Sequence, residues 1–318
     1  MARERLFSPL QLGNVKLNHR IAMAPLTRFR ADEDGIPIDI VRDYYTQRAS
    51  TPGTLIITEA TLISPRASGM ANVPEIWNSR QIAAWKKITD AIAAGFDGVE
   101  IHGANGYLLD QFLQDVCNRR TDNYGGSIEN RARFGLEVTR AIITAVSDSK
   151  KVTIRLSPWT DFDGKRMGDP VPQFCYMVSE LKKLGLAYLH LVESRYAGDV
   201  ATASYHVLTR RNDPFIKLWG PQTPIILAGG FTAETAEKAT EEIYADSNLC
   251  CKLLLICTLP GSKVSDNWSF GWRHAFCQIA TTCMTSVVPP NQHHTTLERC
   301  TSLAKHRSLP ALRWSRTP

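Results

Sequence analysis

Three residues that could act together on a carbonyl compound lie close to one another in the chain: His102, Asn105 and Tyr107. They follow the apolar run GVEIH (98–102), at a point where the chain turns into a loop. His102 and Asn105 could both donate a hydrogen bond to one carbonyl oxygen, which would polarise it and stabilise a developing enolate. The phenol of Tyr107 would add a proton donor. A single histidine at a strand end is more often a packed residue, so the prediction depends on all three together.

Short apolar runs alternate with amphipathic stretches along the first 250 residues, which is typical of repeated βα units with strands buried on both faces. Ser79, Ser127 and Thr232 stand where helix N-caps are expected. We expect strands at 20–25, 54–59, 98–102, 151–156, 187–192 and 224–228, and helices at 79–93, 127–146, 172–184 and 232–243.

These elements fit either a (β/α)₈ barrel with units missing or a doubly wound sheet. Polar and glycine-rich residues follow the strands, as they do at the C-terminal face of a barrel, where active sites are built. A doubly wound sheet would normally carry a glycine fingerprint after its first strand. The first strand here ends in Pro25-Leu26-Thr27. An incomplete barrel is therefore the expected α/β fold.

Longer motifs point to a family. The segment HGANGYLLDQFLQ (102–114), followed by NRRTDNYGGSIENR (118–131), closely resembles the Old Yellow Enzyme family of flavin-dependent ene-reductases. Four shorter motifs agree with it in the family's order: MAPLTR (23–28), EAT (59–61), RLSP (155–158) and AGGF (228–231). The resemblance covers about residues 5–248 and is closest to fungal members.

The resemblance implies a TIM barrel with FMN across its C-terminal mouth and NADPH as the reductant. The residues that match FMN-binding positions are Pro25, Thr27, Ala60, Arg155, Gly229 and Gly230. The implied reaction is reduction of the activated C=C bond of an enone or enal. His102 and Asn105 would hold the substrate carbonyl, and Tyr107 would protonate the α-carbon, which favours reduction over isomerisation.

The chain departs from the family at an internal junction near 91–93. The helix expected over 81–91 runs directly into the strand at 98–102. In the family, a third barrel strand with a flavin-contacting glutamine stands between these two elements. Because a βα unit takes roughly 30 residues, at least one unit is missing.

A second departure follows Asn248. The family's eighth strand ends in a Gly-Arg pair that binds the FMN phosphate, whereas this chain reads LCCKLLLICT (249–258) and has no such pair. We expect that 253–256 can still pair as a strand, but that the family's C-terminal helix is replaced. The sequence thus divides into a truncated FMN-binding barrel, 1–248, and a poorly ordered tail, 249–318.

Composition excludes several classes of protein. With 318 residues, 43% of them hydrophobic, the chain can bury a large core. It has no apolar run of membrane-spanning length and begins with a polar segment, so we expect a cytoplasmic protein. Residues 252–318 hold eight Lys/Arg against two Asp/Glu, which accounts for the whole net charge of +6. The neutral body predicts no nucleic-acid partner.

The tail carries one tempting metal hypothesis. Five residues of the tail could be considered as zinc ligands: Cys277, Cys283, His293, His294 and Cys300. Because they include no Cys-x-x-Cys pair, they do not predict a zinc site.

Three functions remain open. The retained cluster favours an FMN-dependent ene-reductase of fungal secondary metabolism, such as an ergot-alkaloid pathway. The two departures favour impaired activity or an inactive relative, and a non-catalytic binding scaffold is the third reading. The oligomeric state is undetermined, although unpaired strand edges at the deletion would favour association.

Overall fold

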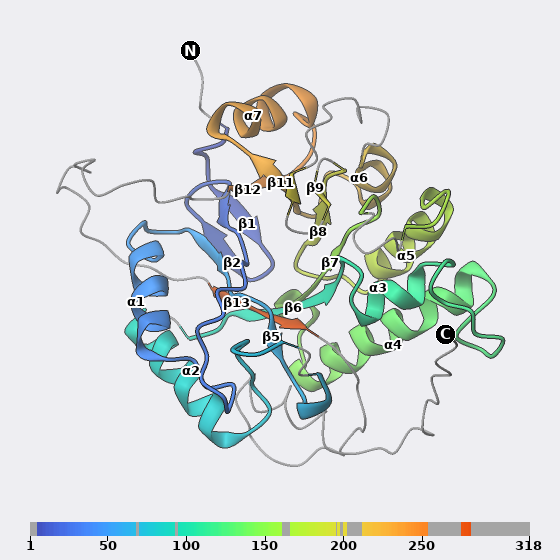
Figure 1. The fold of residues 1–318 in the computed structure, drawn as a ribbon. Helices are drawn as coiled ribbons and strands as arrows, with labels where there is room; N and C mark the ends of the chain where they lie inside the picture. Colours follow the sequence, from blue (N-terminus) through green and yellow to red (C-terminus); the bar gives the residue numbers. More distant parts are fainter. Residues whose placement is uncertain are drawn as a thin grey trace.

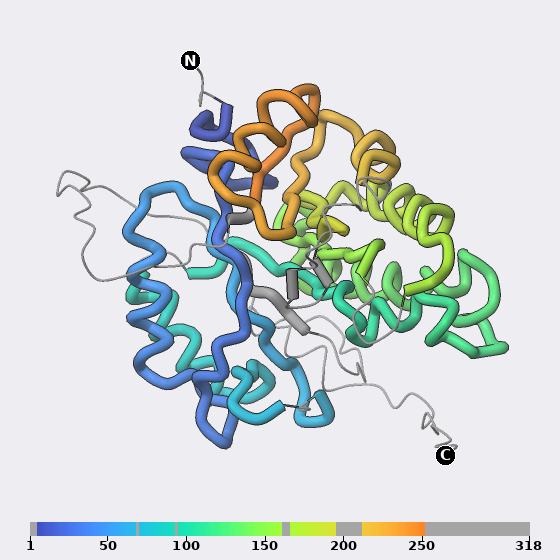
Figure 2. Tube along the Cα trace, turned by 45° about the horizontal axis from the view of Figure 1, so that its top comes forward, coloured from blue at the N-terminus to red at the C-terminus, as the bar shows by residue number. Residues whose placement is uncertain are grey.

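The computed structural model describes residues 5–67, 70–92, 95–160, 166–194, 196–197, 200–201, 212–253 and 275–280. Parallel strands curl into a barrel. A strand near residue 250, β12, pairs with the first barrel strand, β3, so the beginning and the end of this part of the chain meet there. Figure 2 shows the orange segment that contains β12 beside the blue N-terminal segment. In chain order, the first seven barrel strands are β3 (Ile21–Met23), β4 (Leu55–Ile57), β6 (Gly98–Gly103), β7 (Val152–Leu156), β8 (Leu189–Val192), β11 (Ile225–Phe231) and β12 (Leu249–Leu253).

The six predicted strands are confirmed, and all of them are parallel. They form because their apolar runs can be buried on both faces, toward the barrel interior and toward the surrounding helices. A short hairpin of β1 (Leu10–Leu12) and β2 (Val15–Leu17) packs its buried leucines against interior residues such as Ile226 and Leu55. The hairpin therefore closes one end of the barrel.

Four predicted helices are also confirmed: α2 (Ser79–Ala91), α4 (Ile128–Val146), α5 (Val171–Lys183) and α7 (Ala233–Lys238), which continues as a π-helical turn over Ala239–Ile243. Ser127 and Thr232 are N-caps, as expected. Ser79 is not: Asn78 caps α2, because its side chain accepts the backbone N–H of Gln81 at 3.0 Å. The side chain of Gln81 in turn accepts the backbone N–H of Asn78, which completes a capping box.

Shorter elements complete the described fold and were not predicted. Three helices are α1 (Asp39–Arg48), α3 (Leu108–Leu113) and α6 (Asp213–Trp219). The remaining pieces are β5 (Thr61–Leu62), the pair β9 (Tyr196–Ala197) and β10 (Val200–Ala201), and 3₁₀ turns at Pro65–Ala67 and Ser149–Lys151. No helix among the described residues has the length and apolar content to cross a membrane.

The structure locates the missing βα unit between α2 and β6. Helix α2 ends at Ala91, and β6 begins at Gly98. The position that a third strand would occupy, between β4 and β6, is taken by β13 (Ala275–Ala280) from the C-terminal tail, which runs parallel to both. Figure 1 shows β13 beside β6. The expectation of unpaired edges at this gap is therefore wrong, because β13 pairs with each of them.

The eighth barrel position is also filled, but not by the segment that was expected. Strand β12 spans Leu249–Leu253 and pairs with β11 and β3. The predicted strand at 253–256 thus begins four residues too late, and residues 254–256 lie outside the described part of the chain. Apart from β12 and β13, the tail also lies outside it.

Candidate active site

The predicted catalytic cluster is gathered in the turn that connects β6 to α3. His102 is the buried penultimate residue of β6, and Tyr107 is the half-buried N-cap residue of α3. Their ring centroids lie 5.2 Å apart. Asn105, between them, adopts a left-handed backbone with φ of 55°. Because the chain reverses here, all three residues are presented at the carboxyl end of the barrel strands.

Hydrogen bonds from two neighbouring segments hold this turn in place. The backbone N–H of Asn105 donates to the hydroxyl of Ser157, in the loop after β7, at 2.7 Å. The next backbone N–H, of Gly106, donates to the carboxylate of Asp110 in α3 at 2.8 Å. Ser157 and Asp110 are both fully buried. Sequence reasoning placed neither residue in the site, although both stand within its motifs.

Arg155 lies beside His102, on the neighbouring strand of the barrel. The two residues are register partners on β6 and β7, and His190 on β8 is the next partner in the same row. Parallel strands present register partners on the same face. Arg155 is almost completely buried, and its Nε atom has no hydrogen-bond partner in the structure. Burial lowers the pKa of Arg155, while the charge of Glu100 opposes that effect.

A buried polar network, which the sequence did not reveal, joins His190 of this row to the layer beneath it. The carboxylate of Glu100 accepts a hydrogen bond from the Tyr188 hydroxyl and contacts His190 Nδ1, both at 2.9 Å. All three side chains are fully buried. Burial, followed by the charge of Glu100, raises the pKa of Tyr188 well above its ordinary value. The network places a carboxylate one layer below the guanidinium of Arg155.

The ends of β3 and β4 bring the next group of predicted residues to the same mouth. Pro25 is buried and Thr27 half-buried after β3, and Ala60 is half-buried after β4. The buried carboxylate of Glu59 links the two segments, because it accepts the backbone N–H of Arg28 at 2.9 Å.

Glu59 is another residue that the sequence analysis did not single out. Its Oε1 atom is buried without a hydrogen-bond partner. Burial raises its pKa from 4.5 to about 7, and the backbone N–H and charge of Arg28 offset only part of this rise. A carboxyl that follows an apolar strand could have drawn attention, but its burial depends on the tertiary fold.

Gly229 and Gly230 lie near the end of β11, where its register with β12 shifts. Their φ angles are 145° and 66°, which L-residues with side chains rarely adopt. A Cβ atom on Gly229 would lie 2.7 Å from Cβ of Glu193. Gly229 is therefore buried against the Glu193 side chain, which has room only because Gly229 lacks a Cβ atom, whereas Gly230 is exposed.

These features fit the FMN that the resemblance implies. Arg155 offers a buried guanidinium with an unsatisfied N–H at the mouth, which suits an electron-rich ring edge. Gly230, which is exposed and has a positive φ, offers backbone that an anionic phosphate could approach. Pro25, Thr27 and Ala60 follow β3 and β4, which lie beyond β12 from the glycines of β11.

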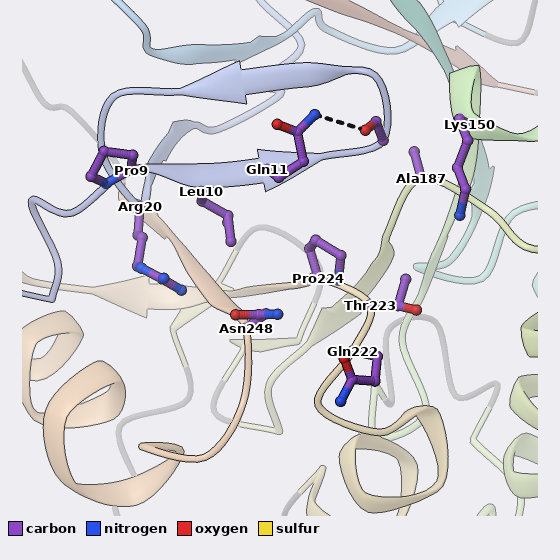
Figure 3. A pocket seen from close by; sticks show the side chains of 11 residues that line it. Pro9, Leu10, Gln11, Arg20, Lys150, Ala187, Gln222, Thr223, Pro224 and Asn248 are labelled. Atoms are coloured by element: carbon purple, nitrogen blue, oxygen red, sulfur yellow. Dashed lines mark hydrogen bonds between the residues drawn. The ribbon is translucent and has the colours of Figure 1, made fainter.

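A cavity of about 340 Å³ lies at the other end of the barrel (Figure 3). Three of its lining residues, Arg20, Pro224 and Asn248, immediately precede strands, and Lys150 lies in the turn before β7. It therefore lies at the amino ends of the strands, where barrels conserve stability rather than catalysis. None of the predicted site residues lines it.

The described residues contain no group of three or more His, Cys, Asp or Glu side chains that could hold a metal ion. The tail residues of the zinc hypothesis lie outside the described part of the chain, except for the backbone of Cys277 in β13.

Comparison with known proteins agrees with this geometry. The profile of the NADH:flavin oxidoreductase / NADH oxidase family matches residues 5–94 and 90–248, two segments that meet where α2 is followed by β6. Chanoclavine-I aldehyde reductase fgaOx3 of Penicillium roqueforti is 44% identical over 311 aligned positions, covering 76% of this chain and 83% of that protein. The probable inactive reductase easA of Epichloe festucae var. lolii is 39% identical, with coverage of 77% and 83%.

The alignment with the Penicillium protein is longer than the part of this chain that it covers, so that relative has residues with no counterpart here. Among solved structures, Old Yellow Enzyme from Pichia sp. AKU4542 superimposes with a TM-score of 0.70 at 29% identity, covering 80% of this chain and 83% of that one. Morphinone reductase gives 0.68 at 31% identity, with coverage of 79% and 86%. FMN is the cofactor of this group of proteins, and NADH or NADPH is the reductant. The chain belongs to the NADH:flavin oxidoreductase / NADH oxidase family, as a relative of Old Yellow Enzyme with a shortened barrel.

Proposed function

We propose that this chain is an FMN-dependent oxidoreductase that uses NADPH to reduce the activated C=C bond of an α,β-unsaturated carbonyl compound. The observation that carries the proposal is the grouping of His102, Asn105 and Tyr107 in one turn, beside Arg155 on the next strand. A packed histidine would not require a neighbouring amide and phenol at the same mouth.

Each residue of the turn has a distinct part in this proposal. His102 and Asn105 bind the substrate carbonyl oxygen, and their N–H groups stabilise the negative charge that develops on it. The Tyr107 hydroxyl holds the proton that is delivered to the α-carbon. Ser157 and Asp110 orient the turn through the backbone N–H groups of Asn105 and Gly106.

The cofactor site is built from the remaining predicted residues. When bound, FMN supplies the hydride that adds to the β-carbon of the substrate, and NADPH restores it. Arg155 would place its charge beside the flavin ring, and the Thr27 hydroxyl would donate a hydrogen bond to a ring carbonyl. Pro25 and Ala60 would contact the ring, and Gly229 and Gly230 would hold the phosphate through their backbone N–H groups.

We propose that activity is impaired relative to intact members of the family. The chain lacks the Gly-Arg pair after its eighth strand. A charge-assisted contact to phosphate contributes roughly 1.5–3 kcal/mol, so FMN affinity would fall by about 10- to 150-fold. The missing third unit also removes a glutamine that contacts the flavin and a loop on the substrate side.

The substrate class follows from the relatives' names. Two proteins of Penicillium roqueforti, 44% and 40% identical, are chanoclavine-I aldehyde reductases, and a Cladobotryum protein at 40% is an aldehyde reductase. A small enal or enone of fungal secondary metabolism, such as an ergot-alkaloid intermediate, fits this group. We place the reaction in the cytoplasm, with no nucleic-acid partner.

A non-catalytic role is the second candidate, and one specific observation favours it. Relatives in Epichloe and Claviceps that are 39% identical carry the names probable inactive reductase and probable inactive dehydrogenase, and this chain has also lost a whole βα unit. Such a protein would retain the barrel mouth as a binding site without turnover.

Reduction of a simple enone, 2-cyclohexenone, by NADPH under anaerobic conditions distinguishes the two. The proposal expects turnover that depends on added FMN and that falls by about 10²- to 10⁴-fold in Tyr107→Phe, because the proton donor is lost. Flavin reduction by NADPH should be unchanged in that variant. Tyr124→Phe, which removes an exposed phenol bonded to Glu137, is the matched control. FMN binding without enone turnover in the wild type would favour the non-catalytic role.

A further inference from the structure

Without its third strand, the barrel would have unpaired backbone N–H and C=O groups along the edges of two strands, β4 and β6. β4 pairs with β3 on one side, and β6 pairs with β7. All residues of β4 and β6 are buried. Their outward backbone N–H and C=O groups therefore need partners other than water. Two strands separated by one missing strand lie roughly 10 Å apart, too far to bond to each other.

β13 lies in this gap with a defined register to both neighbours. Phe276 is the register partner of Ile57 in β4 and of Gly98 in β6. The pairing with β6 continues through Cys277, Gln278 and Ile279, opposite residues 99–101. Beyond β4, Ile279 and Ala280 pair with β5. A single six-residue segment thus bridges both edges in the parallel orientation that every other strand of the barrel has.

The tail sequence suits this insertion. Residues 275–288, AFCQIATTCMTSVV, contain no charged residue, proline or glycine, and all eight Lys/Arg of the tail lie outside them. Such a segment can enter a barrel wall without burying a charge or removing a backbone donor. The 21 residues between β12 and β13 exceed the dozen that a parallel crossover requires.

We propose that Ala275–Ala280 acts as the third strand of the barrel, inserted in cis between β4 and β6, so that the C-terminal tail repairs the internal deletion. The open edges of β4 and β6 are an acceptor site for an extended strand, and the chain's own tail is its ligand, as in other cases of strand addition. The tail is then a structural requirement of the fold rather than an appendage. This inference concerns folding and holds whether or not the proposed enzymatic activity does.

A cysteine cross-link in the full-length chain tests the register. Val99→Cys introduces a thiol at the position paired with the native Cys277. Neighbouring strands bring such pairs within the Cα separation of about 4.4–6.8 Å that a disulfide needs. Val152→Cys is the matched control, because Val152 is the partner of Val99 on the far side of β6 and is equally buried. It stands two strands from β13, roughly 10 Å away.

After mild oxidation, we expect a 99–277 linked peptide by mass spectrometry from monomeric Val99→Cys protein, and no 152–277 peptide from the control. Absence of the 99–277 link, or equal linkage in both variants, would overturn the register. A 99–277 link found only in dimers would show that the strand comes from a second copy, and would overturn insertion in cis.

The stability of a proline variant in β13 provides a second measurement. Cys277→Pro removes a backbone donor from a strand flanked on both sides, whereas Cys277→Ser keeps it. We expect the proline variant alone to lower the thermal midpoint by roughly 5 °C or more and to lose soluble monomer. Equal stability of the two variants would overturn the proposal.

Discussion

The Ser157 hydroxyl accepts a hydrogen bond from the backbone N–H of Asn105 at 2.7 Å, and so joins the loop after β7 to the turn after β6. Asn105 has a left-handed backbone, which costs free energy in a residue with a side chain. The contact therefore stabilises the conformation that presents the Asn105 amide beside His102. Ser157 is fully buried and does not itself need to touch substrate.

Ser157→Ala should weaken substrate binding at the turn without affecting flavin reduction. It leaves a partly buried N–H without its partner, which costs about 1–3 kcal/mol of unfolding free energy. We expect kcat/KM for an enone to fall by about tenfold through a higher KM, while flavin reduction by NADPH is unchanged. Ser149→Ala, which removes a hydrogen bond to Gly185 near the amino end of β7, is the control. Equal effects of the two variants on KM would remove Ser157 from the site.

Glu59 predicts how stability depends on pH. Its pKa rises from 4.5 to about 7 on folding, mainly through burial. Between these values the folded state holds a proton that the unfolded state has released. The free energy of unfolding therefore falls as the pH rises through this window. The full loss above pH 7 is about 3 kcal/mol, because one pKa unit corresponds to about 1.4 kcal/mol.

Glu59→Gln should abolish the contribution of this carboxyl to the pH dependence of the free energy of unfolding. The amide oxygen can still accept the backbone N–H of Arg28, but no charge is buried at high pH. We expect urea denaturation to show that the free energy of unfolding of the variant increases relative to that of the wild type between pH 5 and pH 8. Glu137→Gln, at an exposed position, controls for the type of substitution. Parallel stability profiles of wild type and Glu59→Gln would contradict the burial of a titrating carboxyl.

Gly229→Ala tests the glycine pair of the proposed phosphate site. The new Cβ would lie 2.7 Å from Cβ of Glu193, at a φ of 145°. We expect a loss of about 1–3 kcal/mol of stability and weaker FMN binding, measured by chemical denaturation and by flavin fluorescence titration. Gly168→Ala is the matched control, since a Cβ there meets no heavy atom within 4 Å. If FMN affinity were the same in both variants, the glycine pair would have no part in phosphate binding.

Much of the barrel could be predicted because its strands are buried on both faces. A run such as PIILA is too apolar for an exposed position and too short for a buried helix. The eighth strand was placed four residues late because residues 249–256 are mostly apolar and carry no period that marks where pairing begins. The capping residue of α2 could have been found, since Asn78 and Gln81 have the spacing of a capping box, whereas Ser79 has Ile82 at the matching position.

Other features depend on the tertiary fold. β13 pairs with strands more than 170 residues away in the sequence, and its own residues show no more than an uncharged run. Likewise, the orphaned Nε of Arg155 and the raised pKa of Glu59 arise from burial. The motifs therefore predicted which residues form the site, but not the charges buried around them.

The flavin content of the purified full-length chain tests most directly whether this shortened barrel still forms the family's cofactor site. FMN released from the protein would be quantified against chain concentration, before and after incubation with excess FMN and desalting. We predict a yellow protein that approaches one FMN per chain once FMN is in excess, with a lower content as isolated because the phosphate arginine is missing. A folded, soluble protein that remains colourless after incubation with FMN would contradict an FMN-dependent function.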